Sequence, residues 1–222
     1  MVLSLAEIAR QLASPSVKDR KLALAALRDV EPIDAVPLVK RVLADEDQQV
    51  RSLAVYTLGV KPTAECLGLL LDRLVNEPDY GVRADTAGAL GMLGDIGAFE
   101  ALVTAYETNS DWLVRFSVAV ALGNLGDLRA EPTLLKALAC PESVMQQAAI
   151  AALGEIGAVG RLEQILGFVG SADWLVRQRV AEALGNLLRV DAGLERGRSA
   201  LRYLCRDEHP NVVEAARIAL AG

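Results

Sequence analysis

The chain is poor in the side chains on which many enzymes and metal centres depend. Its 222 residues include one histidine, three cysteines and 4% aromatic residues. The single histidine, His209, cannot supply a Ser-His-Asp or Cys-His arrangement anywhere else in the chain, which disfavours a hydrolase. Cys66, Cys140 and Cys205 are too widely spaced for a zinc site. Their odd number disfavours a disulfide framework and favours a reducing compartment.

The sequence also lacks long apolar runs and a signal for export. No stretch of about 18 uninterrupted apolar residues occurs, and the N-terminus lacks a basic segment followed by an apolar one. We therefore expect a soluble, cytoplasmic protein without a transmembrane segment. The formal net charge of -6 disfavours nucleic-acid binding. The phosphate backbone of DNA or RNA requires clustered Lys and Arg.

What the chain does contain is one motif repeated along its length. The clearest copies are DWLVRFSVAVALGNLGD, from Asp111 to Asp127, and DWLVRQRVAEALGNL, from Asp173 to Leu187. Aligning all copies on their Val position selects residues 19 (an aspartate), 50, 82, 114, 144, 176 and 212, in steps of 30 to 36 residues. A near-constant period of this length, with atypical first and last copies, is typical of a stacked-repeat solenoid.

Each copy has the spacing of a helix with one buried stripe. In the copy that starts at Asp111, apolar residues recur at Val114, Val118 and Leu122. Asp111 is placed to cap the first turn, and Gly126 is placed to end the helix with a positive φ. A second apolar segment of about three turns precedes each copy. We call this preceding segment helix A and the motif helix B.

One helix pair cannot cover its own apolar face, so neighbouring pairs must stack. We predict an all-α fold, a right-handed α-solenoid of about seven HEAT-like helix pairs. Because no Ser-, Gly- or Pro-rich linker interrupts the repeats, residues 1–222 are expected to form a single domain. The repeats are expected at about 1–30, 31–62, 63–94, 95–126, 127–157, 158–190 and 191–222.

Two columns of residues recur within helix B. Gly91, Gly123, Gly154 and Gly185 share one position, where glycine is otherwise unfavourable by up to about 1 kcal/mol. This recurrence predicts a close approach of another backbone. An Asp and an Arg four residues apart open four copies, as Asp47/Arg51, Asp79/Arg83, Asp111/Arg115 and Asp173/Arg177. We interpret them as structural ion pairs, within a helix or between repeats, rather than as a ligand site.

The positions of helix B that the buried stripe leaves out are the candidates for binding a partner. They lie two residues before and two, three, six and ten residues after the Val position. If helix B lines the inner wall of the solenoid, they form a concave groove with an apolar, aromatic middle and a charged end. The predicted groove consists of Tyr80, Asp85, Met92, Trp112, Phe116, Val120, Asn124, Gln147, Trp174, Gln178, Arg179 and Glu182.

The alternative for the two tryptophans, Trp112 and Trp174, is that they pack between neighbouring helices. We assign no catalytic residue and no metal ligand.

The motif Asp-x-x-Val-Arg-x-x-Ala-x-x-Ala-Leu-Gly resembles that of HEAT-repeat proteins of the phycobilisome-lyase type. Repeats two, three, four and six match it at the Asp, Val, Arg, Leu and Gly positions. Repeat two has Thr57 at the second Ala, repeats three, four and six have Thr86, Val118 and Val180 at the first Ala, and repeats five and seven depart at the Arg. Around Asp111 to Ser117 and in its seven repeats, the chain is most similar to phycobilisome degradation proteins of the non-bleaching type. It is less similar to E/F-type bilin lyase subunits.

The resemblance implies a cytoplasmic cyanobacterial protein that engages phycobiliproteins or their open-chain tetrapyrroles. Three functions remain as alternatives. The first is a non-enzymatic scaffold that helps to degrade the phycobilisome, which the absence of a catalytic constellation favours. The second is a bilin lyase or bilin-detaching subunit, in which acids such as Asp85 or Glu182 act on a tetrapyrrole. The third is a generic scaffold for another protein. We expect no cofactor, apart from an open-chain tetrapyrrole as a candidate ligand.

Overall fold

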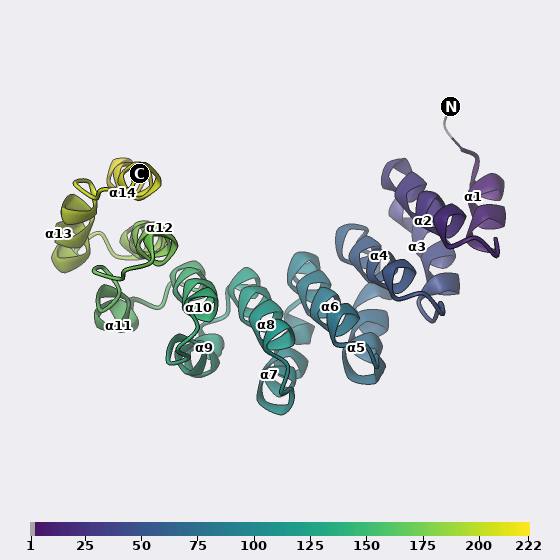
Figure 1. Cartoon of the computed structure of the whole chain (residues 1–222), viewed down its shortest axis with the longest axis horizontal. Helices are drawn as coiled ribbons and strands as arrows, with labels where there is room; N and C mark the ends of the chain where they lie inside the picture. The colour runs from purple at the N-terminus through teal and green to yellow at the C-terminus, as the bar shows by residue number, and fades with distance from the viewer. Residues whose placement is uncertain (1–2) are drawn as a thin grey trace. The chain divides into compact units, whose positions relative to one another are not determined.

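The computed structural model describes residues 3–222, which contain helices and loops but no strand. Fourteen α-helices and five short 3-10 helices follow one another within this range, and the α-helices come in pairs (Figure 1). The predicted all-α fold of HEAT-like helix pairs is therefore confirmed. The chain divides into two compact units, unit 1 up to Ala121 and unit 2 from Leu122. The expectation of a single domain over residues 1–222 stays a prediction.

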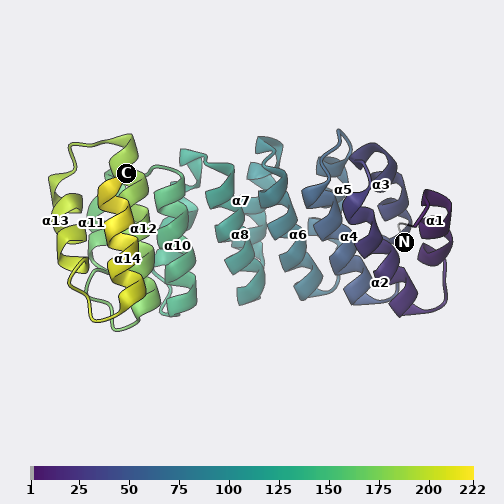
Figure 2. The same ribbon diagram turned by 90° about the horizontal axis from the view of Figure 1, so that it is seen from above.

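Unit 1 contains three complete A/B pairs and most of a fourth. Its A helices are α1 (Leu5–Leu12), α3 (Pro32–Val39), α5 (Cys66–Asn76) and α7 (Phe99–Thr108). Its B helices are α2 (Val17–Ala26), α4 (Gln48–Val60), α6 (Tyr80–Leu93) and the first part of α8 (Trp112–Leu125). The 3-10 helices are η1 (Leu27–Asp29), η2 (Lys40–Val42) and η3 (Ile96–Ala98). Helix α4 packs against α2 on one side and α6 on the other (Figure 2).

Unit 2 contains the end of α8 and three complete pairs. The A helices are α9 (Glu131–Leu138), α11 (Leu162–Leu166) and α13 (Glu195–Leu204), and the B helices are α10 (Ser143–Glu155), α12 (Trp174–Val190) and α14 (Pro210–Ala221). The 3-10 helices η4 (Leu128–Ala130) and η5 (Val159–Arg161) precede α9 and α11. Helix α12 packs between α10 and α14.

The predicted start and stop signals of the B helices are confirmed. The Asp47 carboxylate accepts hydrogen bonds from the backbone N–H groups of Gln49 and Val50, at 2.9 and 3.1 Å, and so caps α4. Asp79, Asp111 and Asp173 likewise cap the first turns of their helices. Gly94, Gly126 and Gly157 follow B helices with φ between 68° and 69°. Only glycine adopts this left-handed conformation at little cost.

The register of the fifth repeat differs from the prediction by one residue. The Val position is fully buried at Val50, Val114 and Val176, but Val144 is 39% exposed and the next residue, Met145, is 3% exposed. The assignment of Val144 to the buried position is therefore wrong. Helix α10 has its N-cap at Glu142, and the buried residue follows three positions later, as it does after each capping Asp. The long, flexible Met145 side chain fills the slot that Val fills elsewhere.

The glycine column marks close contacts between successive B helices at Gly123, Gly154 and Gly185, as predicted. A β-carbon on Gly154 would lie 2.6 Å from the Ala183 Cα, and one on Gly185 would lie 2.8 Å from the Ala219 Cβ. Gly123 meets Ala152 in the same way, and so does Gly59 with Ala89. Real β-carbons essentially never come this close to another atom, so only glycine permits the observed helix separation.

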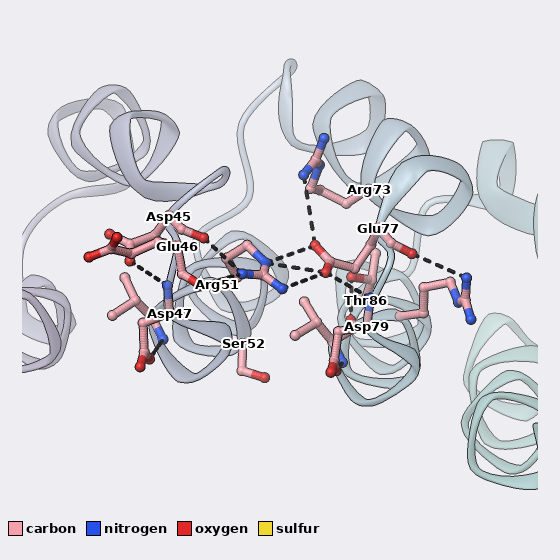
Figure 3. Close-up of polar contacts among 12 residues, drawn as sticks. Asp45, Glu46, Asp47, Arg51, Ser52, Arg73, Glu77, Asp79 and Thr86 are labelled. Atoms are coloured by element: carbon pink, nitrogen blue, oxygen red, sulfur yellow. Dashed lines mark hydrogen bonds and ion pairs between the residues drawn. The ribbon is translucent and has the colours of Figure 1, made fainter. Parts of the chain in front are cut away.

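Two of the four predicted arginines, Arg51 and Arg177, form ion pairs between repeats. Arg51 Nη2 lies 2.8 Å from Glu77 Oε1 in the loop before the next B helix, and Arg51 Nη1 donates to the Asp45 carbonyl at 2.8 Å (Figure 3). Arg20 and Arg177 are placed similarly, with ion pairs to Asp45 and Asp207. The capping Asp of each helix instead binds backbone N–H groups. These arginines therefore join successive repeats, and they do so in a mostly buried position.

Candidate functional site

The exposed surface of the B helices in unit 1 is the first candidate site, and we call it the B-face. Its large apolar side chains lie where water reaches them, and Trp112 is the most exposed of them at 56%. Large apolar side chains left exposed along one set of helices are candidates for a binding site. The exposed apolar residues of the B-face are Leu22, Tyr56, Val60, Tyr80, Met92, Trp112 and Val120.

Four of these residues belong to the predicted groove, and three were missed. Tyr56 and Val60 lie six and ten residues after Val50, and Leu22 lies three residues after Asp19. The offsets of six and ten also select Val120 and Met92 in later repeats, and the offset of three also selects Asp85. Applying the same offsets to repeats one and two would therefore have found them. Of the other predicted residues in unit 1, Asp85 is exposed and Phe116 is half-buried.

A hollow of about 560 Å³ crosses the first turns of the B helices in unit 1. Its apolar lining comes from Leu53, Val82 and Leu113, and its polar lining includes Lys21, Ser52 and Asp85. The Lys21 ammonium donates to the Gln49 side-chain oxygen at 2.6 Å, and the Ser52 hydroxyl donates to the Asp85 carboxylate. The lining of the hollow thus combines apolar side chains with charged ones.

The second candidate site lies along α12 in unit 2. Two cavities, of about 350 and 460 Å³, share Asn186 and Arg189 in their linings. The smaller cavity reaches α14 and contains the predicted residues Gln178 and Glu182. The larger one contains the predicted Asn124 and also Glu155. The structure therefore brings several predicted polar residues together within unit 2.

Charged and amide groups along α12 hold one another in place. Arg179 Nη1 lies 2.6 Å from Glu182 Oε2, and Gln178 Nε2 donates to the other Glu182 oxygen at 2.8 Å. A carboxylate oxygen of Glu155 lies against Gly123. Desolvation by surrounding protein atoms raises the pKa of Glu155, Arg179 opposes this shift and Glu182 reinforces it. Glu155 is therefore the carboxyl group in this site that is best suited to hold a proton.

The two tryptophans have different environments. The Trp174 ring stacks on the His209 ring, with centroids 3.8 Å apart and an angle of 9° between the planes. Trp174 is half-buried, which favours the packing interpretation for this residue, whereas Trp112 is free to contact a partner. Gln147 donates a hydrogen bond to the Asp173 carboxylate at 3.2 Å, next to Trp174. Within unit 2, both predicted residues thus lie where two repeats meet.

No helix within residues 3–222 has the length and apolar character needed to cross a membrane. In the same part of the chain, no group of three or more His, Cys, Asp or Glu side chains could hold a metal ion.

Comparison with known proteins identifies the repeat type. A family model described as HEAT repeats matches residues 67–154 and again residues 131–221. No curated protein matches the chain.

Solved structures share the fold at low sequence identity. The complex of CpcE and CpcF of phycocyanin lyase from a Nostoc species matches with a TM-score of 0.67 and 21% identity, over 99% of this chain and 94% of that chain. The Escherichia coli protein YibA matches with a TM-score of 0.60 and 16% identity, over 99% and 93%. An engineered protein matches with a TM-score of 0.62 and 22% identity, over 98% and 67%.

Proposed function

Because the chain belongs to the HEAT-repeat family, we propose that it is a protein-binding scaffold that engages phycobiliprotein subunits during phycobilisome degradation. The B-face is the observation that carries the proposal. HEAT helix pairs present extended surfaces on which partners bind, and here that surface exposes large apolar side chains. The sequence motif and the fold likeness to the phycocyanin lyase complex support the choice of partner.

Trp112 and Tyr80 are the expected anchors of the interaction. They are 56% and 52% exposed, and they lie at the same position of successive B helices. Tryptophan and tyrosine dominate the binding energy of many interfaces because they bury a large area at a low entropic cost. Covering the Trp112 side chain with a partner is expected to contribute about 2 kcal/mol or more.

The test is to mix the protein with purified phycocyanin or allophycocyanin and to measure binding by calorimetry. Trp112→Ala should weaken binding by about 30-fold, the equivalent of about 2 kcal/mol. Ile33→Ala is the matched control, because Ile33 is 74% exposed but lies on the A helix α3. The proposal fails if neither phycobiliprotein binds, or if Trp112→Ala binds as tightly as Ile33→Ala.

A second candidate function, a subunit that attaches or detaches bilins, is favoured by the Glu155 carboxyl group. A carboxyl group whose pKa is raised by desolvation holds its proton more readily than an ordinary glutamate and is suited to exchange that proton with a ligand. The hydrogen-bond donors around Glu155 are of the kind that can bind the propionate groups of an open-chain tetrapyrrole. Arg189 donates to the Asn186 side-chain oxygen at 2.6 Å and is suited to pair with a propionate, and both residues line the same cavity as Glu155.

This candidate is tested by adding free phycocyanobilin to the protein and recording its absorption spectrum. A bound or protonated bilin should change the spectrum, and Glu155→Gln should reduce the change while the protein stays folded. An unchanged spectrum, alone and in the presence of phycocyanin, would exclude this function.

A further inference from the structure

The Asp85 carboxylate lines the unit 1 hollow and has no ion-pair partner in the part of the chain that the structure describes. Its hydrogen-bond donor is the neutral Ser52 hydroxyl, and no Lys or Arg in the described part of the chain forms an ion pair with it. The side chain is exposed and lines the hollow. A carboxylate held in place by one neutral donor keeps most of its capacity to bind a cation.

The charges of the hollow are separated along its length. Lys21 lies on α2, where its ammonium already donates to Gln49 at 2.6 Å. Asp85 lies on α6, and α4 packs between these two helices (Figure 2). The second carboxylate at the α6 end, Asp79, accepts the Val82 N–H at 3.0 Å as a helix cap. The α6 end is therefore negative, and Asp85 is its available charge.

Apolar groups adjoin this negative end. Val82 and Leu113 line the hollow, and the exposed Tyr80 and Trp112 lie close by in the sequence, on the first turns of α6 and α8. An apolar partner side chain on these rings would exclude water from an ion pair beside them, which strengthens the pair. The negative faces of aromatic rings also attract cations.

We propose that this hollow receives a basic side chain, Lys or Arg, from a segment of the protein partner. An apolar residue of the same segment packs on Tyr80 and Trp112. The net charge of -6 also favours the approach of a basic segment. This inference rests on one part of the proposed function, namely that the B-face binds a protein. It adds that the partner's contacting segment is basic.

The experiment uses two short probes, acetyl-Leu-Lys-Leu-Lys-Leu-amide and acetyl-Leu-Glu-Leu-Glu-Leu-amide. In a Trp174→Phe background, which keeps an aromatic ring on His209, Trp112 is the sole tryptophan and its fluorescence reports on the B-face. The lysine peptide should change this fluorescence saturably, and the glutamate peptide should bind at least about tenfold more weakly.

Substitution of the carboxylate makes the test specific. Asp85→Asn should weaken binding of the lysine peptide by about fivefold, because a partly desolvated ion pair is lost. Asp34→Asn is the control, since it removes the same charge from an exposed residue of the A helix α3. Calorimetry with the same peptides on the unsubstituted chain gives a second reading, should Trp174→Phe fail to fold.

Equal binding of the two peptides, or equal effects of Asp85→Asn and Asp34→Asn, would overturn the inference. If the lysine peptide binds through Asp85 but neither phycocyanin nor allophycocyanin binds, the proposed function fails and this inference stands. If a phycobiliprotein binds and Asp85→Asn leaves its affinity unchanged, this inference alone fails.

Discussion

The same substitution, Gly to Ala, should have opposite effects at two neighbouring places in unit 1. Gly59, near the end of α4, faces Ala89 of α6, whereas Gly88 of α6 has no atom within 4 Å of the position of an added β-carbon. We expect Gly59→Ala to destabilise the protein and Gly88→Ala to stabilise it. The contrast isolates the contact between α4 and α6 from the general helix preference of alanine.

The expected magnitudes follow from the two sites. A β-carbon on Gly59 would lie 2.9 Å from both the Cα and the carbonyl oxygen of Ala89. Because carbon atoms pack at about 3.5 to 4.0 Å, the helices would have to separate by roughly 0.5 to 1 Å. Overpacking of this kind costs about 1 to 3 kcal/mol, and the helix preference of alanine returns up to about 1 kcal/mol. With about 1 kcal/mol returned, Gly59→Ala should therefore lose up to about 2 kcal/mol.

At Gly88 only the helix preference acts, so Gly88→Ala should gain up to about 1 kcal/mol. The two variants should thus differ by roughly 2 kcal/mol, which corresponds to a separation of about 4 to 8 °C in Tm for a chain of this size. Urea and thermal denaturation followed by circular dichroism measure both quantities. If Gly59→Ala is as stable as Gly88→Ala, the glycine column does not set the distance between B helices.

Arg83 Nε is buried without a hydrogen-bond partner, whereas the equivalent Arg51 Nε donates to Glu77. Asn109 occupies the loop position relative to Arg83 that Glu77 occupies relative to Arg51. A carboxylate introduced there by Asn109→Asp is therefore expected to raise the free energy of unfolding by about 1 kcal/mol. No gain in urea denaturation would show that the loop cannot bring a carboxylate to Arg83. Desolvation raises the pKa of Glu155 in the folded protein, so folding favours the protonated carboxyl group. The stability that this protonated group contributes is complete below the ordinary pKa of 4.5 and is lost as the pH rises through the folded-state pKa. Glu155→Gln should therefore be more stable than the wild type at neutral pH, with a difference that shrinks towards pH 4.5, and a constant difference would contradict this sign.

Features that depend on a few neighbouring residues could be predicted from the sequence. The cap at Asp47 and the positive φ of Gly126 each satisfy backbone groups within one turn, so residue type and spacing identify them. The repeat of these signals predicts the helix pairs. The glycine column predicts the close approach of successive B helices, because Gly154 and Gly185 stand where local helix preference alone would select against glycine.

Features that depend on contacts with a neighbouring repeat could not be predicted from the sequence. Val144 and Met145 are both apolar, and only packing against neighbouring helices decides that Met145 is buried. The carboxylate partner of Arg51 is Glu77, which the local pattern of the motif does not indicate.

The two tryptophans show the limit most clearly. Trp112 and Trp174 sit in the same local sequence, Asp-Trp-Leu-Val-Arg, and they occupy the same position of helix B. Trp174 stacks on His209, which comes from the following repeat, whereas Trp112 is exposed. The sequence by itself therefore determined the helices, their ends and their close stacking, since these depend on local hydrogen bonding and side-chain size. Tertiary structure alone decided which side chains remain free to bind a partner, because burial depends on atoms contributed by a different repeat.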